Sequence, residues 1–188
     1  MKRVGAVVWL TGLSGAGKTV IASAVLAELR YRGVDAELLD GDEMRKSLCK
    51  DLGFSKEDRD ENVRRVGGAA GELSAGGAVA LVALVSPYRA ARDAVRRRQE
   101  RFIEVYVNAP VEVCESRDPK GLYRKARRGE IPMFTGVSDP YEPPLNPEVE
   151  CFTDRETVVE CAGKILLALE RLVGLPQSQS IGALEIQL

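Results

Sequence analysis

Residues 12–19 read Gly12-Leu13-Ser14-Gly15-Ala16-Gly17-Lys18-Thr19 and come directly after an apolar run at residues 4–10. This is the pattern G-x-x-x-x-G-K-[ST], a glycine turn between a buried strand and a helix, where backbone N–H groups surround a phosphate. The glycines let the backbone approach the anion, the lysine reaches the β- and γ-phosphates, and the final hydroxyl ligates Mg²⁺. An ordinary strand-to-helix turn is the alternative, but the Lys-Thr pair in this context favours a nucleoside triphosphate site.

The composition is typical of one globular domain. The chain has 188 residues, of which 45% are hydrophobic and 29% charged. Its 27 Lys and Arg residues balance 28 Asp and Glu residues, so no overall charge indicates nucleic acid or a membrane as the main partner. The first apolar run is too short for a membrane span and lacks a cleavage site, which predicts a cytoplasmic protein. We expect a domain at residues 1–173 and a C-terminal tail at 174–188.

The cysteines do not indicate a metal site. There is no C-x-x-C pair and no histidine in the sequence. The common zinc sites and a Cys/His nucleophile are therefore not predicted. We expect four reduced, partly buried thiols, at Cys49, Cys114, Cys151 and Cys161.

Short apolar runs alternate with helical patterns along the chain, which is typical of βαβ units. We expect strands at residues 4–10, 36–39, 78–85, 102–107 and 148–152. The predicted fold is α/β, a P-loop three-layer αβα sandwich around a mainly parallel five-stranded sheet. Gly33 should end the helix after the glycine turn, and Thr153 with Glu156, in capping-box spacing, should begin the last helix.

One long segment interrupts this alternation. Residues 118–147 contain six of the nine prolines, so we expect a loop around one short helix. Such a long loop in a compact domain is usually functional. We interpret residues 117–143 as a lid over phosphates, although a plain basic surface helix is the alternative; its cations are Arg117, Lys120, Arg124, Lys125, Arg127 and Arg128.

Two carboxylates follow the second predicted strand, in the sequence Asp40-Gly41-Asp42. Open α/β sheets place their sites at the carboxyl ends of parallel strands. One carboxylate can hold Mg²⁺, while the other can orient an acceptor hydroxyl and take its proton. The sequence leaves open which does which, and an Asp-Gly turn that caps a helix is the alternative.

A cluster of donors is predicted for an anionic acceptor. Arg59, Asn62 and Arg65 recur at i, i+3 and i+6 of a predicted helix, and Phe54 before it can stack on a base. A solvated charged helix face is the alternative. The turn that begins at Ser86, after the third strand, should lie at the same edge of the sheet.

These motifs together resemble the adenylylsulfate kinase family over about residues 4–170. The resemblance rests on an ordered set: the glycine turn from Gly12, Asp40-Gly41-Asp42 with Arg45, residues 52–65, Ser86-Pro87-Tyr88-Arg89, residues 118–123, Phe134-Thr135-Gly136 and Asp139-Pro140-Tyr141-Glu142. It implies transfer of the ATP γ-phosphoryl to the 3′-hydroxyl of adenosine 5′-phosphosulfate (APS), a step of sulfate assimilation. It also implies a homodimer.

The resemblance carries roles to individual residues. ATP would be held by residues 12–19 and Arg127, and Mg²⁺ by Thr19 and Asp40. The catalytic residues would be Lys18, Asp40, Asp42 and Ser86. The acceptor APS would contact Asp42, Arg45, Phe54, Arg59, Asn62, Arg65, Val85, Ser86, Lys120 and Phe134.

Ser86 has two possible roles. The family has been described with a phosphoserine at this position, but in-line transfer needs only positioning and cations, so we expect an acceptor-binding hydroxyl. The alternative functions are a kinase of another small hydroxyl compound, such as a nucleoside or sugar, and a nucleotide-binding module without turnover.

Overall fold

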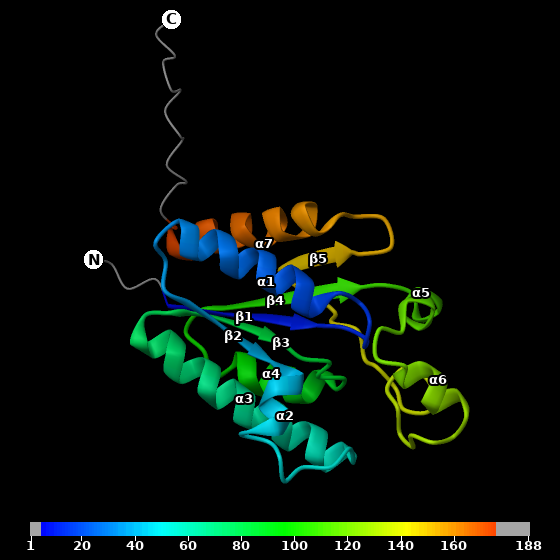
Figure 1. Cartoon of the computed structure of the whole chain (residues 1–188). Helices are drawn as coiled ribbons and strands as arrows, with labels where there is room; N and C mark the ends of the chain where they lie inside the picture. Colours follow the sequence, from blue (N-terminus) through cyan, green and yellow to red (C-terminus); the bar gives the residue numbers. More distant parts are fainter. Residues whose placement is uncertain (1–4, 176–188) are drawn as a thin grey trace, which may run out of the picture.

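A five-stranded, fully parallel sheet forms the centre of the computed structural model, which describes residues 5–175. The strand order is β2-β3-β1-β4-β5, with helices on both faces (Figure 1). The strands are β1 (Ala6–Thr11), β2 (Ala36–Asp40), β3 (Val79–Ala83), β4 (Phe102–Asn108) and β5 (Val149–Phe152). The predicted fold class and all five strands are confirmed to within a few residues; Val4 and residues 176–188 of the tail lie outside the described residues.

Helices α1 (Lys18–Tyr31) and α7 (Val158–Val173) cover one face of the sheet, and α3 (Lys56–Gly76) and α4 (Arg89–Arg96) cover the other (Figure 1). Every residue of β1 is buried, because helices cover this central strand on both faces of the sheet. Alternate side chains serve alternate cores: Val8 and Leu10 pack with α1 and α7, while Val7 and Trp9 pack towards α3.

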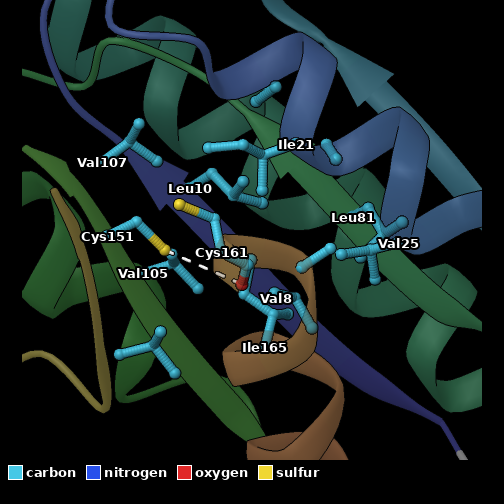
Figure 2. Packing of buried hydrophobic residues seen from close by; sticks show 14 of the residues in the cluster. Val8, Leu10, Ile21, Val25, Leu81, Val105, Val107, Cys151, Cys161 and Ile165 are labelled. Atoms are coloured by element: carbon cyan, nitrogen blue, oxygen red, sulfur yellow. Dashed lines mark hydrogen bonds between the residues drawn. The ribbon is translucent and has the colours of Figure 1, made fainter. Parts of the chain in front are cut away.

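The larger core lies between the sheet and the α1/α7 layer. Figure 2 shows Leu10, Ile21, Val25, Val105 and Ile165 meeting there, from two helices and two neighbouring strands. Burying each side chain of this size contributes about 1.5–3 kcal/mol relative to leaving it exposed. This packing fixes α1, and therefore the glycine turn that precedes it.

The ends of these two helices test the predicted caps. Gly33 follows the end of α1 at φ 71°, as expected for a residue in the left-handed region. The predicted start of the last helix at Thr153 is wrong, because the capping box is formed by Thr157 and Glu160 instead. Thr153 has another role: its hydroxyl donates to the carbonyl oxygen of Ala16 at 2.8 Å.

The remaining helices lie at the carboxyl ends of the strands. These are α2 (Gly41–Lys46), α5 (Val111–Arg117) and α6 (Leu122–Arg127). Between α6 and β5 the described chain has no further helix, which confirms the prediction of one short helix in the proline-rich segment. None of the helices within residues 5–175 has the length and apolar character needed to cross a membrane.

Candidate active site

A cavity of about 1260 Å³ opens at the carboxyl ends of the strands. It exceeds the usual size of a single-ligand pocket, roughly 300–1,000 Å³. Residues from the glycine turn, the β2–α2 junction, α3, the turn after β3 and the lid all line it. Of the predicted site residues, the structure brings sixteen to its walls: residues 14–19, Asp40, Asp42, Arg45, Phe54, Arg59, Asn62, Val85, Ser86, Lys120 and Phe134.

The glycine turn has the conformation that its sequence predicts. Gly12, Gly15 and Gly17 have φ values of 152°, 78° and 103°. A Cβ atom at Gly12 would lie 2.3 Å from the carbonyl oxygen of Val107, so a larger residue cannot fit. Glycine at this position therefore lets the turn pack closely against β4.

Lys18 lies at the centre of this turn. Its Nζ donates to the carbonyl oxygens of Gly12 at 2.9 Å and Leu13 at 2.8 Å. Burial lowers the pKa of this ammonium to about 8. An anion in the turn would raise this pKa again, because its negative charge favours the ammonium over the neutral amine.

Two side-chain oxygens that could ligate a metal meet beside the turn, from Thr19 and Asp40. The Thr19 hydroxyl donates to Asp40 Oδ2 at 2.6 Å, and Asp40 Oδ1 accepts from the backbone N–H of Asp42 at 2.9 Å. Asp40 is thus the N-cap of α2, as the capping interpretation expected, and it also lines the cavity. The Asp42 carboxylate forms an ion pair with Lys120 of the lid.

The far wall of the cavity is aromatic and cationic. The Phe54 ring is contacted by two guanidinium groups, that of Arg45 at 4.4 Å and that of Arg59 at 5.7 Å from the ring centre. This ring is 54% exposed, so part of its face is open to a ligand. The buried Oδ1 of Asn62 has no hydrogen-bond partner within residues 5–175. Phe134 adds a second ring from the lid, packed edge-on against Tyr123.

Contrary to expectation, the hydroxyl of Ser86 is directed into the protein and away from the cavity. Ser86 is 2% exposed, and its Oγ accepts from Trp9 Nε1 at 3.0 Å and donates to Thr11 Oγ1 at 3.0 Å. Its φ of 41° turns the side chain towards β1. The residue contributes to the cavity wall, but its hydroxyl is already engaged inside the protein.

Arg65 and Arg127 lie outside the cavity walls, contrary to expectation. Arg65 is six residues after Arg59, about 240° around the helix, and it pairs with Asp51 and Glu61 on the outer face. Arg127 pairs with Glu115 of α5. Gly12 and Leu13 also do not line the cavity; they form the base of the turn beneath Lys18.

Arg117 is a site residue that the sequence predicted only as one of six lid cations. Its guanidinium donates to the carbonyl oxygens of Gly15 at 3.3 Å and Thr153 at 2.5 Å, and it lines the cavity. It therefore connects the glycine turn to the loop before α7. The sequence signal that could have identified Arg117 is its place at the end of α5, because α5 follows β4, which ends at the cavity edge of the sheet.

Cys151, Cys161 and Glu156 come together although their spacing predicted no such group. Their ligand atoms lie within 4.8 Å of one another, and Figure 2 shows the two cysteines side by side in the core. Burial raises the pKa of the Cys151 thiol, and the Glu156 carboxylate is engaged with Lys164 at 2.6 Å. All four cysteines are free and buried.

Comparison with known proteins identifies the family. The family model described as adenylylsulphate kinase matches residues 4–152. The chain belongs to the adenylylsulphate kinase family. Adenylyl-sulfate kinases from Rippkaea orientalis and Microcystis aeruginosa are 58% and 54% identical to it; the matches cover 92% and 96% of this chain and 95% and 100% of those proteins.

Solved structures agree with membership of the adenylylsulphate kinase family. The APS kinase of Mycobacterium tuberculosis, solved in complex with AMPPNP and APS, superposes with a TM-score of 0.86 at 42% identity, covering 88% of this chain and 98% of that one. A gluconokinase from Sinorhizobium meliloti has a TM-score of 0.61 at 18% identity, covering 92% and 95%, and shares the fold alone.

Proposed function

We propose that this protein is an adenylylsulfate kinase, which transfers the γ-phosphoryl group of ATP to the ribose 3′-hydroxyl of APS. The observation that carries the proposal is that one cavity is lined both by the glycine turn and by Asp42, Phe54, Arg59 and Asn62. A donor nucleotide and an acceptor nucleotide both need room there, and the volume of about 1260 Å³ supplies it. Membership of the family supports the same reaction.

The donor side is assigned to the glycine turn. Backbone N–H groups of residues 14–19 at the start of α1 would hold the phosphates, and Lys18 would contact their negative charge. The lysine would then exchange its bonds to Gly12 and Leu13 for bonds to phosphate. Arg117 replaces Arg127 as our candidate for the lid cation on this side, because it alone of the two lines the cavity.

The residues beside the turn fit Mg²⁺. Thr19 Oγ1 and Asp40 Oδ2 are both oxygen donors, lie 2.6 Å apart and reach the cavity, and Mg²⁺ prefers such hard ligands. We assign the metal to these two residues. When bound, Mg²⁺ neutralises charge on the β- and γ-phosphates.

The acceptor side is assigned to α2, α3 and the lid. Phe54 and Phe134 would contact the adenine, and Arg45, Arg59 and Lys120 would contact the phosphosulfate. Asn62 Oδ1, which is buried and has no partner in the part of the chain that the structure describes, would accept a hydrogen bond from the acceptor. These assignments differ from the sequence-based roles in two places: Arg65 is left out, and so is the Ser86 hydroxyl, which is bonded inside the protein.

Asp42 is our candidate to orient the 3′-hydroxyl and take its proton. It has an ion pair with Lys120 rather than a role in capping, whereas Asp40 is committed to Thr19 and the α2 N-cap. The geometry supports direct in-line transfer, since the Ser86 hydroxyl is bonded to Trp9 and Thr11 and is not presented to ATP.

We also propose that residues 1–173 form the catalytic domain, with residues 117–143 as its lid, and that the protein works as a homodimer in the cytoplasm. The dimer rests on the family resemblance. One APS kinase, from Thiobacillus denitrificans, is hexameric; it is 36% identical with a TM-score of 0.70, and the match covers 93% of this chain but 30% of that longer one. Light scattering of the purified protein distinguishes a dimer from a hexamer.

The reaction is tested by offering the protein MgATP with APS, and separately with a panel of nucleosides and sugars. The expected product is the 3′-phosphorylated sulfonucleotide, identified by mass and fragmentation. The variants Lys18→Ala and Asp42→Ala should abolish its formation. ADP release with a different acceptor would instead support a kinase of another small hydroxyl compound, and MgATP binding without turnover would indicate a regulatory module.

A further inference from the structure

Arg92 is a buried cation just behind the active-site cavity. It lies in α4, is 1% exposed, and is not among the residues that line the cavity. Its guanidinium donates in three directions: Nε to Glu104 Oε1 at 2.7 Å, Nη1 to the Ser86 carbonyl oxygen at 2.6 Å, and Nη2 to the Glu142 carbonyl oxygen at 2.7 Å. A buried ion pair is weak evidence for stability, because desolvation offsets the attraction. The geometry of the three bonds therefore suggests another role.

The first of its targets is the turn after β3. Ser86 has φ 41°, in the left-handed region that a residue with a Cβ seldom adopts. Such a conformation persists only when the surroundings fix it. The Arg92 bond to the Ser86 carbonyl oxygen and the Trp9 bond to its hydroxyl fix the turn from two sides. Val85 and Ser86, which line the acceptor end of the cavity, are placed by this turn.

The second target is the return end of the lid, residues 139–142. This segment has further bonds to the same turn: Tyr88 donates to Asp139 Oδ2 at 2.8 Å, and the Glu142 N–H donates to the Pro87 carbonyl oxygen at 2.8 Å. Arg92 adds a charged donor to the Glu142 carbonyl oxygen. The return end of the lid is therefore attached to the turn after β3, which contains Ser86.

We propose that Arg92 is a positioning residue for phosphoryl transfer, which sets the return end of the lid relative to the Ser86 turn. The inference rests on the proposed function, since its effect is on the acceptor. The fork geometry of arginine is essential, because a lysine ammonium in this place cannot reach the Glu104 carboxylate and both carbonyl oxygens together. Small displacements at a reacting centre have large effects, on the order of 100-fold in rate for 1 Å.

Arg96 is a matched control on the same helix. It donates to the other oxygen of Glu104, Oε2, at 3.2 Å, and it pairs with Glu148 at 2.6 Å. It has no hydrogen bond to the Ser86 turn or to residues 139–142 among the bonds within residues 5–175. A change at Arg96 therefore disturbs the same ion-pair network and leaves the link between turn and lid in place.

The test compares Arg92→Lys with Arg96→Lys. For R92K we expect kcat/KM for APS to fall about 10- to 100-fold with a higher KM for APS, while Kd for AMPPNP stays within about twofold of wild type. Amide hydrogen exchange of a peptide spanning residues 134–142 should be faster in R92K and unchanged in R96K. Rates are normalised to the folded fraction from thermal unfolding.

Each outcome has one meaning. Equal effects of R92K and R96K on KM and on lid exchange would overturn the proposal and leave Arg92 a structural residue. Wild-type protein that does not phosphorylate APS would refute the proposed function, while lid exchange would still report on the link. If R92K does not fold, the double variant Arg92→Gln/Glu104→Gln removes both buried charges, and the same split between APS and AMPPNP is expected.

Discussion

The Thr19 hydroxyl donates a 2.6 Å hydrogen bond to Asp40 Oδ2, which joins the first turn of α1 to the end of β2. The two residues are 21 positions apart in the sequence, and β1, which leads into the glycine turn, is separated from β2 by β3 in the sheet. The bond brings the glycine turn and the Asp-Gly-Asp sequence together at the wall of one cavity. The two carboxylate oxygens of Asp40 have different partners: Oδ2 accepts from Thr19, and Oδ1 caps α2. Different substitutions can therefore remove one function or both.

Asp40→Asn should keep the cap and lose the metal ligand. The asparagine oxygen can still accept from the Asp42 N–H, so we expect the free energy of unfolding to change by less than about 0.5 kcal/mol. Turnover should fall by about 100-fold or more, and the Mg²⁺ dependence of ATP affinity, measured by titration calorimetry, should weaken. Asp40→Ala should lose about 1 kcal/mol more stability. Full turnover by D40N would show that Asp40 does not hold the metal.

The affinity for MgATP should fall at alkaline pH. Lys18 has a lowered pKa, about 8, because it is buried without an anion. ATP favours the charged ammonium, so binding above pH 8 must take up a proton, and Kd should rise about tenfold per pH unit there. Below pH 8 the lysine is already charged and Kd should level off. Titration calorimetry of ATP binding in buffers of different ionisation enthalpy measures how many protons are taken up.

Lys18→Arg is the control for that pH profile. An arginine stays charged throughout, so its Kd should be independent of pH between about 8 and 10, whatever its absolute value. A wild-type profile that is equally flat would mean that Lys18 does not titrate in this range.

Ser86→Ala should retain turnover at saturating APS. The Ser86 hydroxyl is bonded to Trp9 and Thr11, and the residue is buried. The loss should appear in stability instead, roughly 1–3 kcal/mol, because the buried indole N–H of Trp9 is left without an acceptor. Trp9 is the only tryptophan, so its fluorescence reports on the change directly. Loss of turnover together with phosphoserine in the wild type would support a covalent step.

Arg59 and Arg65 form a matched pair on α3. Arg59→Gln should raise KM for APS by about tenfold or more, since Arg59 lines the cavity beside Phe54. Arg65→Gln should leave KM unchanged and cost at most about 1 kcal/mol, because its partners Asp51 and Glu61 are on the outer surface. Steady-state kinetics of both variants measure these KM values. A similar rise in KM for R65Q would contradict the placement of Arg65 outside the acceptor site.

Local patterns were enough to predict much of this molecule. The glycine turn from Gly12 and the strand that precedes it determine both the fold class and the donor site, because each position of the motif has its own steric or electrostatic reason. The placing of Asp40 and Asp42 followed from the rule that parallel strands open their sites at their carboxyl ends.

The remaining features depend on tertiary contacts. Thr153 and Thr157 both have capping-box spacing with a glutamate, and only the packing of the Thr153 hydroxyl against the glycine turn decides between them. Spacing alone put Arg65 with Arg59, although six residues turn a helix by about 240°. The direction of the Ser86 hydroxyl depends on Trp9, which is 77 residues away.

The burial of every residue in β1 has a consequence for how the protein fails under stress. The donor turn follows a strand that can separate from its neighbours only when the whole sheet opens. Part of the acceptor wall, with Asp42 and Arg45, lies instead on α2, none of whose residues is buried. Warming or mild denaturant should therefore remove acceptor recognition first. A molecule damaged in this way still holds its nucleotide, and it has lost the ability to pass the phosphoryl group on.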